Sequence, residues 1–259
     1  MASERKATAD PARSLAILWR TREPTSRSAG PGLSVDRVVR AAIGIVDAEG
    51  LDALTMRRVA EALGVGTMSV YTYVPGKAEL VDVLIDTVYG EMPRAAVAGD
   101  WRARLERIAR DNLVLYQRHP WMLRAETTTR PVLGPHLLAK YDHELTAIAD
   151  IGLTDVEMDA VLTLVLGHVK SAARAASEVV DLERETGMTD GQWWQSHAPW
   201  LETFMTAGSY PTAARVGTAA GQQHGAAYGP EYAFEFGLQR VLDGISVVVA
   251  ERAAAGQPG

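Results

Sequence analysis

Apolar residues recur at helical intervals through most of the chain, and no stretch sustains the alternation of apolar and polar residues that marks a half-buried strand. From residue 100 onward, the proline and glycine clusters fall between helical patterns, so an all-helical body is expected. The expected helices of this body span residues 101–118, 121–128, 133–151, 155–185, 192–207 and 231–253.

A group of shorter helical patterns precedes the body. Ser34 is placed to cap the first helix, and Gly50 to end it. Its apolar residues share one stripe, which is expected to brace the elements that follow: Val35, Val38, Val39, Ala42, Ile43 and Val46. The last helix of the group begins at Lys77 and ends near Met92, before Pro93, and it connects the two parts of the chain. Its apolar residues are Leu80, Val81, Leu84, Ile85 and Val88.

Between these helices, residues 54–80 predict a helix-turn-helix. Thr55 is a suitable N-cap, and Gly64 can take the left-handed conformation that ends a helix. The inward face of this first helix is expected to hold Met56, Val59, Ala60 and Leu63. The chain restarts at Gly66 and Thr67 as a second short helix, which reaches about Val74 and suits a DNA groove.

On the second helix, Met68, Tyr71 and Val74 recur three apart and are expected to face the core. That leaves the hydroxyl side chains of Thr67, Ser69, Thr72 and Tyr73 facing outward, where they suit phosphate and base-edge contacts. Lys77 begins the next helix, where a cation does not favour the helix dipole, so a phosphate partner is expected. The alternative interpretation is a helical hairpin with a polar exterior.

The segment from Val35 to Leu84, above all residues 50–60 and 71–77, resembles the DNA-binding domain of the tetracycline-repressor (TetR) family. The resemblance implies an all-α protein: a three-helix helix-turn-helix domain at 34–92, then a larger helical ligand-binding and dimerisation domain at 93–259. It also implies a homodimer that binds a palindromic DNA operator and responds to a small molecule. Matching positions imply phosphate contacts from Thr55, Arg57, Tyr73 and Lys77, and a base-reading helix that holds Gly66, Thr67, Met68, Ser69 and Thr72. Many relatives carry arginine where this chain has Thr72, so a relative's operator sequence does not transfer.

The charge distribution qualifies this interpretation. The formal net charge is −6, which argues against generic nucleic-acid binding. Residues 1–90 hold 11 basic and 11 acidic residues, so the whole excess of acid lies beyond them. An N-terminal DNA-binding domain with no net charge but with local basic residues can still bind DNA when two copies of the domain are paired. The chain has no cysteine, no apolar run long enough to span a bilayer and no visible signal peptide, which suits the cytoplasm.

Residues 1–33 carry six basic and three acidic residues among many Ser, Pro and Gly. Such a segment is expected to be a flexible basic extension, with at most one helical turn at 15–19. The alternative is an arm along DNA, with Arg20, Arg22 and Arg27 as minor-groove candidates.

Two body helices carry more apolar surface than one domain of this size needs. The helix at 155–185 is apolar nearly all round at 160–166, and Ala172, Ala173 and Ala176 allow close approach. The last helix has a broad stripe formed by Tyr232, Phe236, Leu238, Val241, Leu242, Ile245, Val248 and Val249. A two-fold dimer built on these helices would place two recognition helices about 34 Å apart. The alternative is that both helices are internal core.

Aromatic residues, methionines and histidines of the body can form an apolar small-molecule pocket with polar anchors, and the effector is expected to be hydrophobic or aromatic. The candidates are Tyr116, His119, Met122, His168, Trp193, Trp194, His197 and Phe204, although any one of them can equally be core. No cofactor or metal is expected. His143-Glu144 lacks the second histidine of a zinc-protease helix, and no other enzyme motif is present, so no catalytic residue is predicted.

Three hypotheses remain. The first is a ligand-responsive regulator, in particular a repressor that a small molecule releases from DNA. The second is a DNA-binding dimer that acts as an activator or without a ligand. The third is a helical small-molecule-binding protein that never engages DNA.

Overall fold

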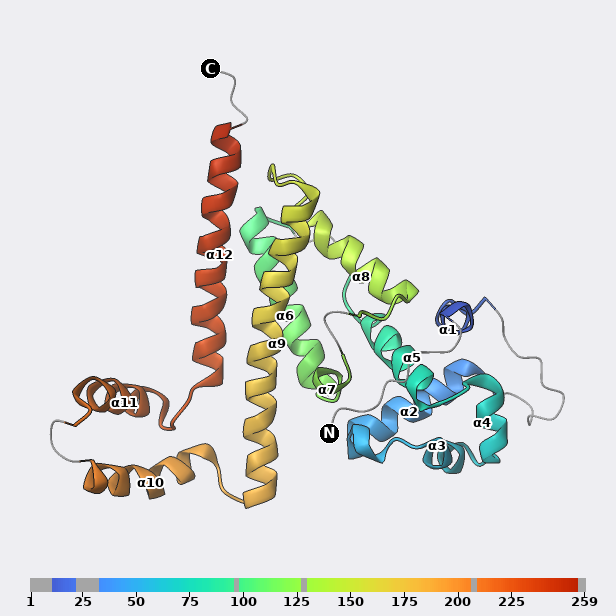
Figure 1. Ribbon diagram of the computed structural model, residues 1–259, viewed down its shortest axis with the longest axis horizontal. Helices are drawn as coiled ribbons and strands as arrows, with labels where there is room; N and C mark the ends of the chain where they lie inside the picture. Colours follow the sequence, from blue (N-terminus) through green and yellow to red (C-terminus); the bar gives the residue numbers. More distant parts are fainter. Residues whose placement is uncertain (1–10, 22–32, 96–97, 127–129, 206–208, 256–259) are drawn as a thin grey trace. The chain divides into compact units, whose positions relative to one another are not determined.

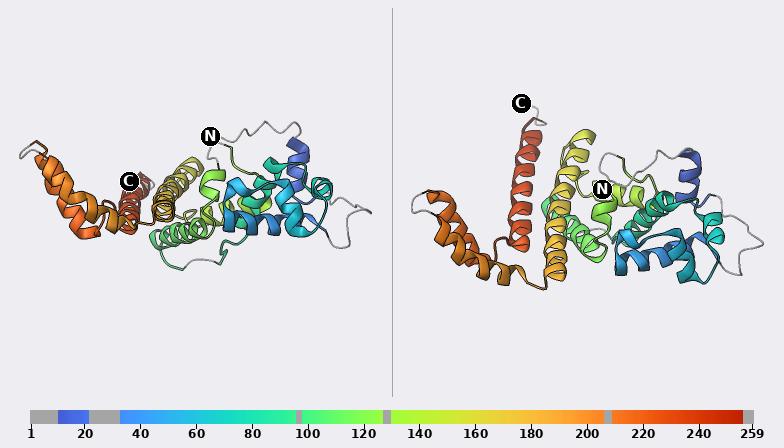
Figure 2. Two further views of the ribbon diagram at one scale, coloured as in Figure 1. Left: turned by 90° about the horizontal axis from the view of Figure 1, so that it is seen from below. Right: turned by 60° about the horizontal axis from the view of Figure 1, so that its bottom comes forward.

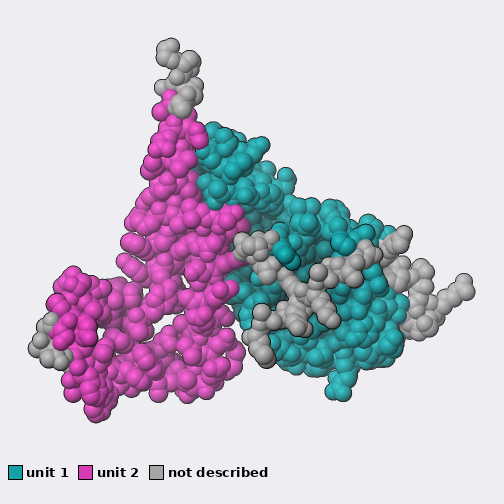
Figure 3. All heavy atoms as spheres, in the orientation of Figure 1, with its two compact units in different colours: residues 1–162 teal, residues 163–259 magenta. Residues whose placement is uncertain are grey.

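The computed structural model describes residues 11–21, 33–95, 98–126, 130–205 and 209–255, and these residues contain helices and no strand (Figure 1). The expected all-α fold is therefore confirmed for the described part of the chain. The chain forms two compact units, residues 1–162 and residues 163–259 (Figure 3). The long helix α9 (Asp155–Thr186) runs through the boundary between these residue ranges. None of the described helices is long and apolar enough to cross a membrane.

The first unit opens with the elements of the head, residues 34–92. They are α2 (Val35–Glu49), the 3-10 helix η1 (Leu51–Ala53), α3 (Met56–Leu63), α4 (Thr67–Tyr73) and α5 (Lys77–Tyr89). The predicted boundaries follow from capping. Ser34 and Thr55 each accept a hydrogen bond from a backbone N–H three residues on. Gly50 (φ 81°) and Gly64 (φ 67°) end their helices with left-handed φ values, which glycine adopts without strain.

Most predicted inward positions of the head are buried. In α2, however, Ile45 is buried and Ile43 is only half-buried, contrary to the expected stripe. The prediction for α4 is wrong in three places. Met68 and Tyr71 face solvent with 77% and 40% of their surface exposed, whereas Tyr73 is only 7% exposed. Val70, Tyr73 and Val74 form the buried face instead, because α4 follows the three-then-four spacing of an α-helix rather than a strict spacing of three.

The rest of the first unit is built from α6 (Trp101–Arg118), α7 (Met122–Ala125), α8 (Pro135–Thr146) and the beginning of α9. Asp100 caps α6 by accepting from the N–H of Ala103, and Pro135 occupies the first turn of α8, where it needs no N–H donor. The connecting helix α5 packs against α1 (Pro11–Leu18), α2, α7 and α8, so it is the element that the head shares with the body.

The N-terminal extension contains more structure than expected. Residues Pro11–Leu18 form α1, which packs against α5 and buries Leu18. The helical turn expected at 15–19 therefore belongs to a longer helix, because Leu18 has an apolar surface to pack on. Arg20 bonds to Asp36 and to the carbonyl of Ile17, so its guanidinium is engaged within the protein. Arg22 and Arg27 lie outside the described residues.

The second unit continues α9 and adds α10 (Asp190–Phe204), α11 (Pro211–His224) and α12 (Pro230–Ala255). α9 and α12 lie side by side, as do α10 and α11 (Figure 2). The sequence pattern did not predict α11, because its residues are small and polar and form no apolar stripe. Gly221 of α11 packs directly on Trp194 of α10, where a Cβ would lie only 2.7 Å from the indole ring.

The apolar stripe of α12 divides between two faces. Leu238, Leu242 and Ile245 are buried within the unit, whereas Tyr232 and Phe236 are exposed. α9 behaves in the same way, since Val165 and Val169 are buried while Leu164 is exposed. Each helix therefore buries some of its apolar residues and exposes others.

Candidate nucleic-acid interface and effector site

The helix-turn-helix presents one exposed helix, α4, on a buried support. Val70 and Val74 are fully buried, and they hold α4 against the capped helix α3. The outward face of α4 carries Met68, Tyr71 and Thr72, with Thr67 and Ser69 half-buried beside them. Thr72 Oγ1 donates to the Met68 carbonyl at 3.1 Å. This face combines a thioether, a phenol and hydroxyl groups, which suits contacts with base edges and phosphates.

The sequence prediction missed Tyr71 as a candidate DNA contact, because it placed this residue in the core. It also placed Tyr73 on the outer face of α4, although Tyr73 is buried. Tyr73 is only 7% exposed, so little of its surface is available for a phosphate contact. The spacing of Val70, Tyr73 and Val74 is the signal that could have found the correct face. The other predicted DNA contacts stay predictions.

The cations beside α4 differ in how firmly they are bound within the protein. Arg57 has an 83% exposed side chain and forms only a loose pair with Glu61 of the same helix, at 3.3 Å. The Lys77 ammonium is exposed at the start of α5 and lies 3.4 Å from the Leu51 carbonyl. Arg58 is held at 2.7 Å by Glu49. Arg57 and Lys77 are therefore the cations that a phosphate could recruit without breaking a strong contact.

His119, a predicted pocket residue, instead joins the body to the head. Its Nδ1 lies 2.7 Å from Asp47 Oδ1, in the last turn of α2, and its Nε2 lies 3.2 Å from Glu91. Trp121 Nε1 donates to the same Asp47 oxygen at 2.8 Å. Both ring systems are buried, so Asp47 satisfies two donors that water cannot reach freely.

Tyr116 lies in a buried polar cluster of the first unit. Its hydroxyl and that of Tyr89, in α5, donate to the two carboxylate oxygens of Glu126. Burial, together with the neighbouring carboxylate, raises the pKa of Tyr89 and of Tyr116 well above the ordinary value for tyrosine. Both phenols therefore stay protonated and remain hydrogen-bond donors.

A second polar cluster lies between α6 and α8. Asn112 donates to the Glu144 carboxylate at 2.7 Å, and Lys140 pairs with the other oxygen of that carboxylate at 2.7 Å. Asn112, Lys140 and Glu144 are all buried, and the Lys140 ammonium also lies over the Tyr89 ring. Asn112 Oδ1 is buried and has no hydrogen-bond partner among the described residues. Such an acceptor is costly unless water or a ligand donates to it.

A small surface hollow gives access to this second cluster. Lys140, Glu144 and Ile108 line it, together with Met92, Pro93, Arg94, Asp111 and His143. None of the eight predicted pocket residues lines this hollow. The polar residues that the structure gathers here were missed because Lys140 and Glu144 stand four apart, which is also the pattern of a solvated helix face.

The eight predicted pocket residues are divided between the two units, and their role in binding an effector stays a prediction. Tyr116, His119 and Met122 are buried in the first unit, and the other five belong to the second unit. There, His168 Nε2 contacts the Phe234 carbonyl at 2.9 Å, and Trp193 stacks on His197. Trp194 packs on Gly221, and Phe204 is exposed. Within the described residues, no group of three or more His, Asp or Glu side chains could hold a metal ion.

Comparisons with known proteins cover both the head and the body. A family described as "Bacterial regulatory proteins, tetR family" matches residues 38–84, and "Tetracyclin repressor-like, C-terminal domain" matches residues 92–249. The HTH-type transcriptional repressor DrrR1 of Streptomyces coeruleorubidus is 44% identical over 259 residues, which is 99% of this chain and 93% of that protein.

Solved structures that resemble this chain also include a TetR family protein, ActR. Apo ActR from Streptomyces coelicolor is 26% identical and superposes with a TM-score of 0.69, covering 86% of this chain and 99% of ActR. ActR in complex with actinorhodin is 27% identical with a TM-score of 0.66, covering 87% of this chain and 99% of ActR. The chain belongs to the TetR family of bacterial transcriptional regulators.

Proposed function

We propose that this protein is a repressor that binds a palindromic operator as a homodimer in the cytoplasm and leaves it when a small molecule binds. The exposed face of α4, held on the buried support of Val70 and Val74, is the observation that carries the proposal. DNA binding would use Tyr71, Thr72 and the neighbouring side chains on bases, with Arg57 and Lys77 on phosphates. DrrR1, the relative with 44% identity, is itself named a transcriptional repressor.

The free faces of α9 and α12 support a homodimer. On α9, Val156 and Leu164 are exposed, with the small residues Ala160 and Gly167 on the same side. On α12, Phe236, Gly244 and Val247 are exposed at helical intervals. Small residues let helices approach closely, and exposed apolar side chains gain free energy when a second copy covers them. A two-fold axis through such an interface would present two copies of α4 to one DNA duplex.

The buried polar cluster of Asn112, Lys140 and Glu144 is the proposed effector site. Asn112, whose Oδ1 has no hydrogen-bond partner among the described residues, and the buried cation Lys140 both contact the carboxylate of Glu144. The adjoining hollow is small, so a hydrophobic or aromatic molecule that carries a hydroxyl donor and a second polar group would have to widen it to reach Asn112. Tyr89 connects the site to α5, the helix shared with the head, because the Lys140 ammonium lies over its ring. ActR, a structural relative, has been solved in complex with actinorhodin and with (S)-DNPA.

Selection of randomised duplex DNA by the purified dimer tests the DNA-binding half of the proposal. An enriched inverted repeat, lost when Tyr71 and Lys77 are both replaced by alanine in a still-folded dimer, is the expected result. No enrichment by folded dimer would reject operator binding and favour a small-molecule-binding protein that does not engage DNA.

Release of that duplex by a library of planar aromatic compounds, actinorhodin included, tests the effector half. A compound that releases the wild type and fails to release Asn112→Leu, which still binds the duplex, is the expected result. A compound that releases both proteins equally would contradict the assignment of Asn112. Absence of release across the library would favour an activator or a regulator without a ligand.

A further inference from the structure

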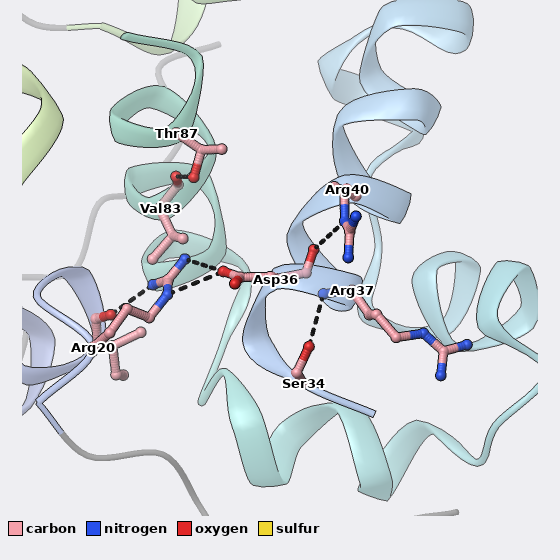
Figure 4. Close-up of polar contacts among 8 residues, drawn as sticks. Arg20, Ser34, Asp36, Arg37, Arg40, Val83 and Thr87 are labelled. Carbon is pink, nitrogen blue, oxygen red and sulfur yellow. Dashed lines mark hydrogen bonds and ion pairs between the residues drawn. The ribbon is translucent and has the colours of Figure 1, made fainter. Parts of the chain in front are cut away.

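The helix α1 lies outside both matched family segments, residues 38–84 and 92–249, yet its C-terminal end is bonded to elements of the head and of the body. Arg20 Nε and Nη2 donate to Asp36 Oδ1 at 3.3 and 3.2 Å, and Nη1 donates to the Ile17 carbonyl at 2.7 Å. Figure 4 shows this guanidinium between α1 and the first turn of α2, whereas Arg37 points away from it. The Arg20 side chain therefore fixes the start of α2 to the end of α1.

Two neighbouring residues fix α1 to the rest of the first unit. Trp19 Nε1 donates to the Leu133 carbonyl at 3.0 Å, just before α8 begins. Leu18 is buried where α1 packs against α5. Together, Leu18, Trp19 and Arg20 form what we call the α1 clamp, which joins α2 of the head to the segment that enters α8 of the body.

The backbone of Arg20 supports a specific role for its side chain. Arg20 has φ 52°, the only positive φ of a non-glycine residue in the described part of the chain. The N–H of Thr21 bonds to the Ala16 carbonyl and that of Arg20 to the Ile17 carbonyl, which is the helix-ending pattern in which glycine usually holds this position. An arginine is strained there, and strain of this kind is retained where the surrounding contacts hold the residue in place.

α2 has 15 residues and is therefore about 22 Å long, and it is held at both ends. Asp47, in its last turn, bonds to His119 and Trp121 of the body. Asp36, in its first turn, bonds to Arg20 of the α1 clamp. A helix held at one end can pivot, whereas a helix held at both ends keeps its direction relative to its support.

We infer that the α1 clamp is a positioning element that fixes the orientation of the DNA-binding head on the body. This inference rests on the proposed operator binding. In a dimer, the orientation of each head sets the separation of the two α4 helices, and hence the half-site spacing that the protein accepts. The clamp makes the dimer selective for one spacing, and its loss lets the heads adapt to other spacings at a cost in affinity for the correct one.

The test compares the selected operator with copies whose half-sites are moved apart by one and by two base pairs. Arg20→Gly is the informative variant, because glycine suits the left-handed backbone and only the anchoring side chain is lost. Loss of one half-exposed contact is expected to change the orientation equilibrium of each head by about twofold, so two heads together should lower the preference for the correct spacing by about fourfold. Trp19→Phe, which removes only the indole donor, is expected to change the preference in the same direction.

Arg184→Ala is the matched control, since Arg184 also pairs with an aspartate at 3.2 Å, but within α9 alone. It is expected to keep the wild-type preference. An unchanged preference in both Arg20→Gly and Trp19→Phe, with normal thermal unfolding, would overturn the positioning role. Failure of the wild type to enrich any inverted repeat would instead reject operator binding itself, so the two failures are distinguishable.

Discussion

Asp47→Ala tests whether the head is fixed to the body through one buried acceptor. The substitution removes the oxygen that receives His119 Nδ1 at 2.7 Å and Trp121 Nε1 at 2.8 Å. Both donors belong to buried side chains, so they cannot simply turn to solvent. His119 keeps one contact, with Glu91, whereas the described residues offer the Trp121 indole N–H no other acceptor.

The expected effect follows from these contacts. Each unsatisfied buried donor costs about 1–3 kcal/mol. An aspartate in the last turn of a helix interacts unfavourably with the helix dipole, so its removal offsets this loss by about 0.3–1 kcal/mol of unfolding free energy. The free energy of unfolding should therefore fall by about 2–3 kcal/mol, which lowers the melting temperature by about 5–10 °C for a chain of this size.

Thermal and urea unfolding of Asp47→Ala and Asp52→Ala provide the measurement. Asp52 also joins the head to the body, by pairing with Arg124 at 3.0 Å, but its side chain and that of Arg124 are 82% and 65% exposed. Loss of such an exposed pair is expected to change the free energy of unfolding by less than about 0.5 kcal/mol. Equal losses in the two variants would refute the conclusion that Asp47 is the buried attachment point.

Three further predictions concern the recognition helix, its support and the connecting helix. Tyr71→Ala should weaken operator binding by about tenfold or more without changing the melting temperature, whereas unchanged affinity would remove Tyr71 from the interface. Thr55→Ala should cost about 1 kcal/mol of unfolding free energy, because the N–H of Arg58 loses its cap, and Thr55→Ser should restore it; equal melting of all three proteins would contradict the cap. Burial raises the pKa of Asp86, although it accepts from the N–H groups of Leu137 and His136, so the folded chain binds the proton more tightly than the unfolded chain does. Wild-type stability relative to Asp86→Asn should therefore fall in thermal unfolding as the pH rises above about 4, and a constant difference would contradict the raised pKa.

The sequence predicted helix boundaries well where a single residue determines the end of a helix. Ser34, Thr55 and Gly64 act locally, through hydrogen bonds or a φ value that neighbouring residues do not alter. α11 escaped prediction because its position depends on packing, as with Gly221 on Trp194, and not on an apolar stripe of its own.

The candidate sites were predicted unevenly for a related reason. The helix-turn-helix is contiguous in sequence, so its presence was clear even though two of the three residues assigned to the buried face of α4, Met68 and Tyr71, are exposed. The polar cluster contains Asn112 and Glu144, which are 32 positions apart and lie on two helices. The apolar periodicity of each helix does not indicate that these two side chains are in contact. Aromatic residues such as Trp193 and Phe204 did not identify a ligand pocket reliably. Aromatic residues at helical spacing can stack on a neighbour, as Trp193 does, or lie exposed, as Phe204 does.

The measurement that tests the central claim most directly is a titration of the selected duplex, followed by fluorescence anisotropy and by the mass of the complex. The proposal predicts two chains on each intact inverted repeat, much weaker binding to a duplex with one half-site scrambled, and an affinity that falls as salt rises. A complex of one chain per duplex, or equal affinity for the intact and the scrambled duplex, would contradict the conclusion that paired α4 helices read a palindromic operator.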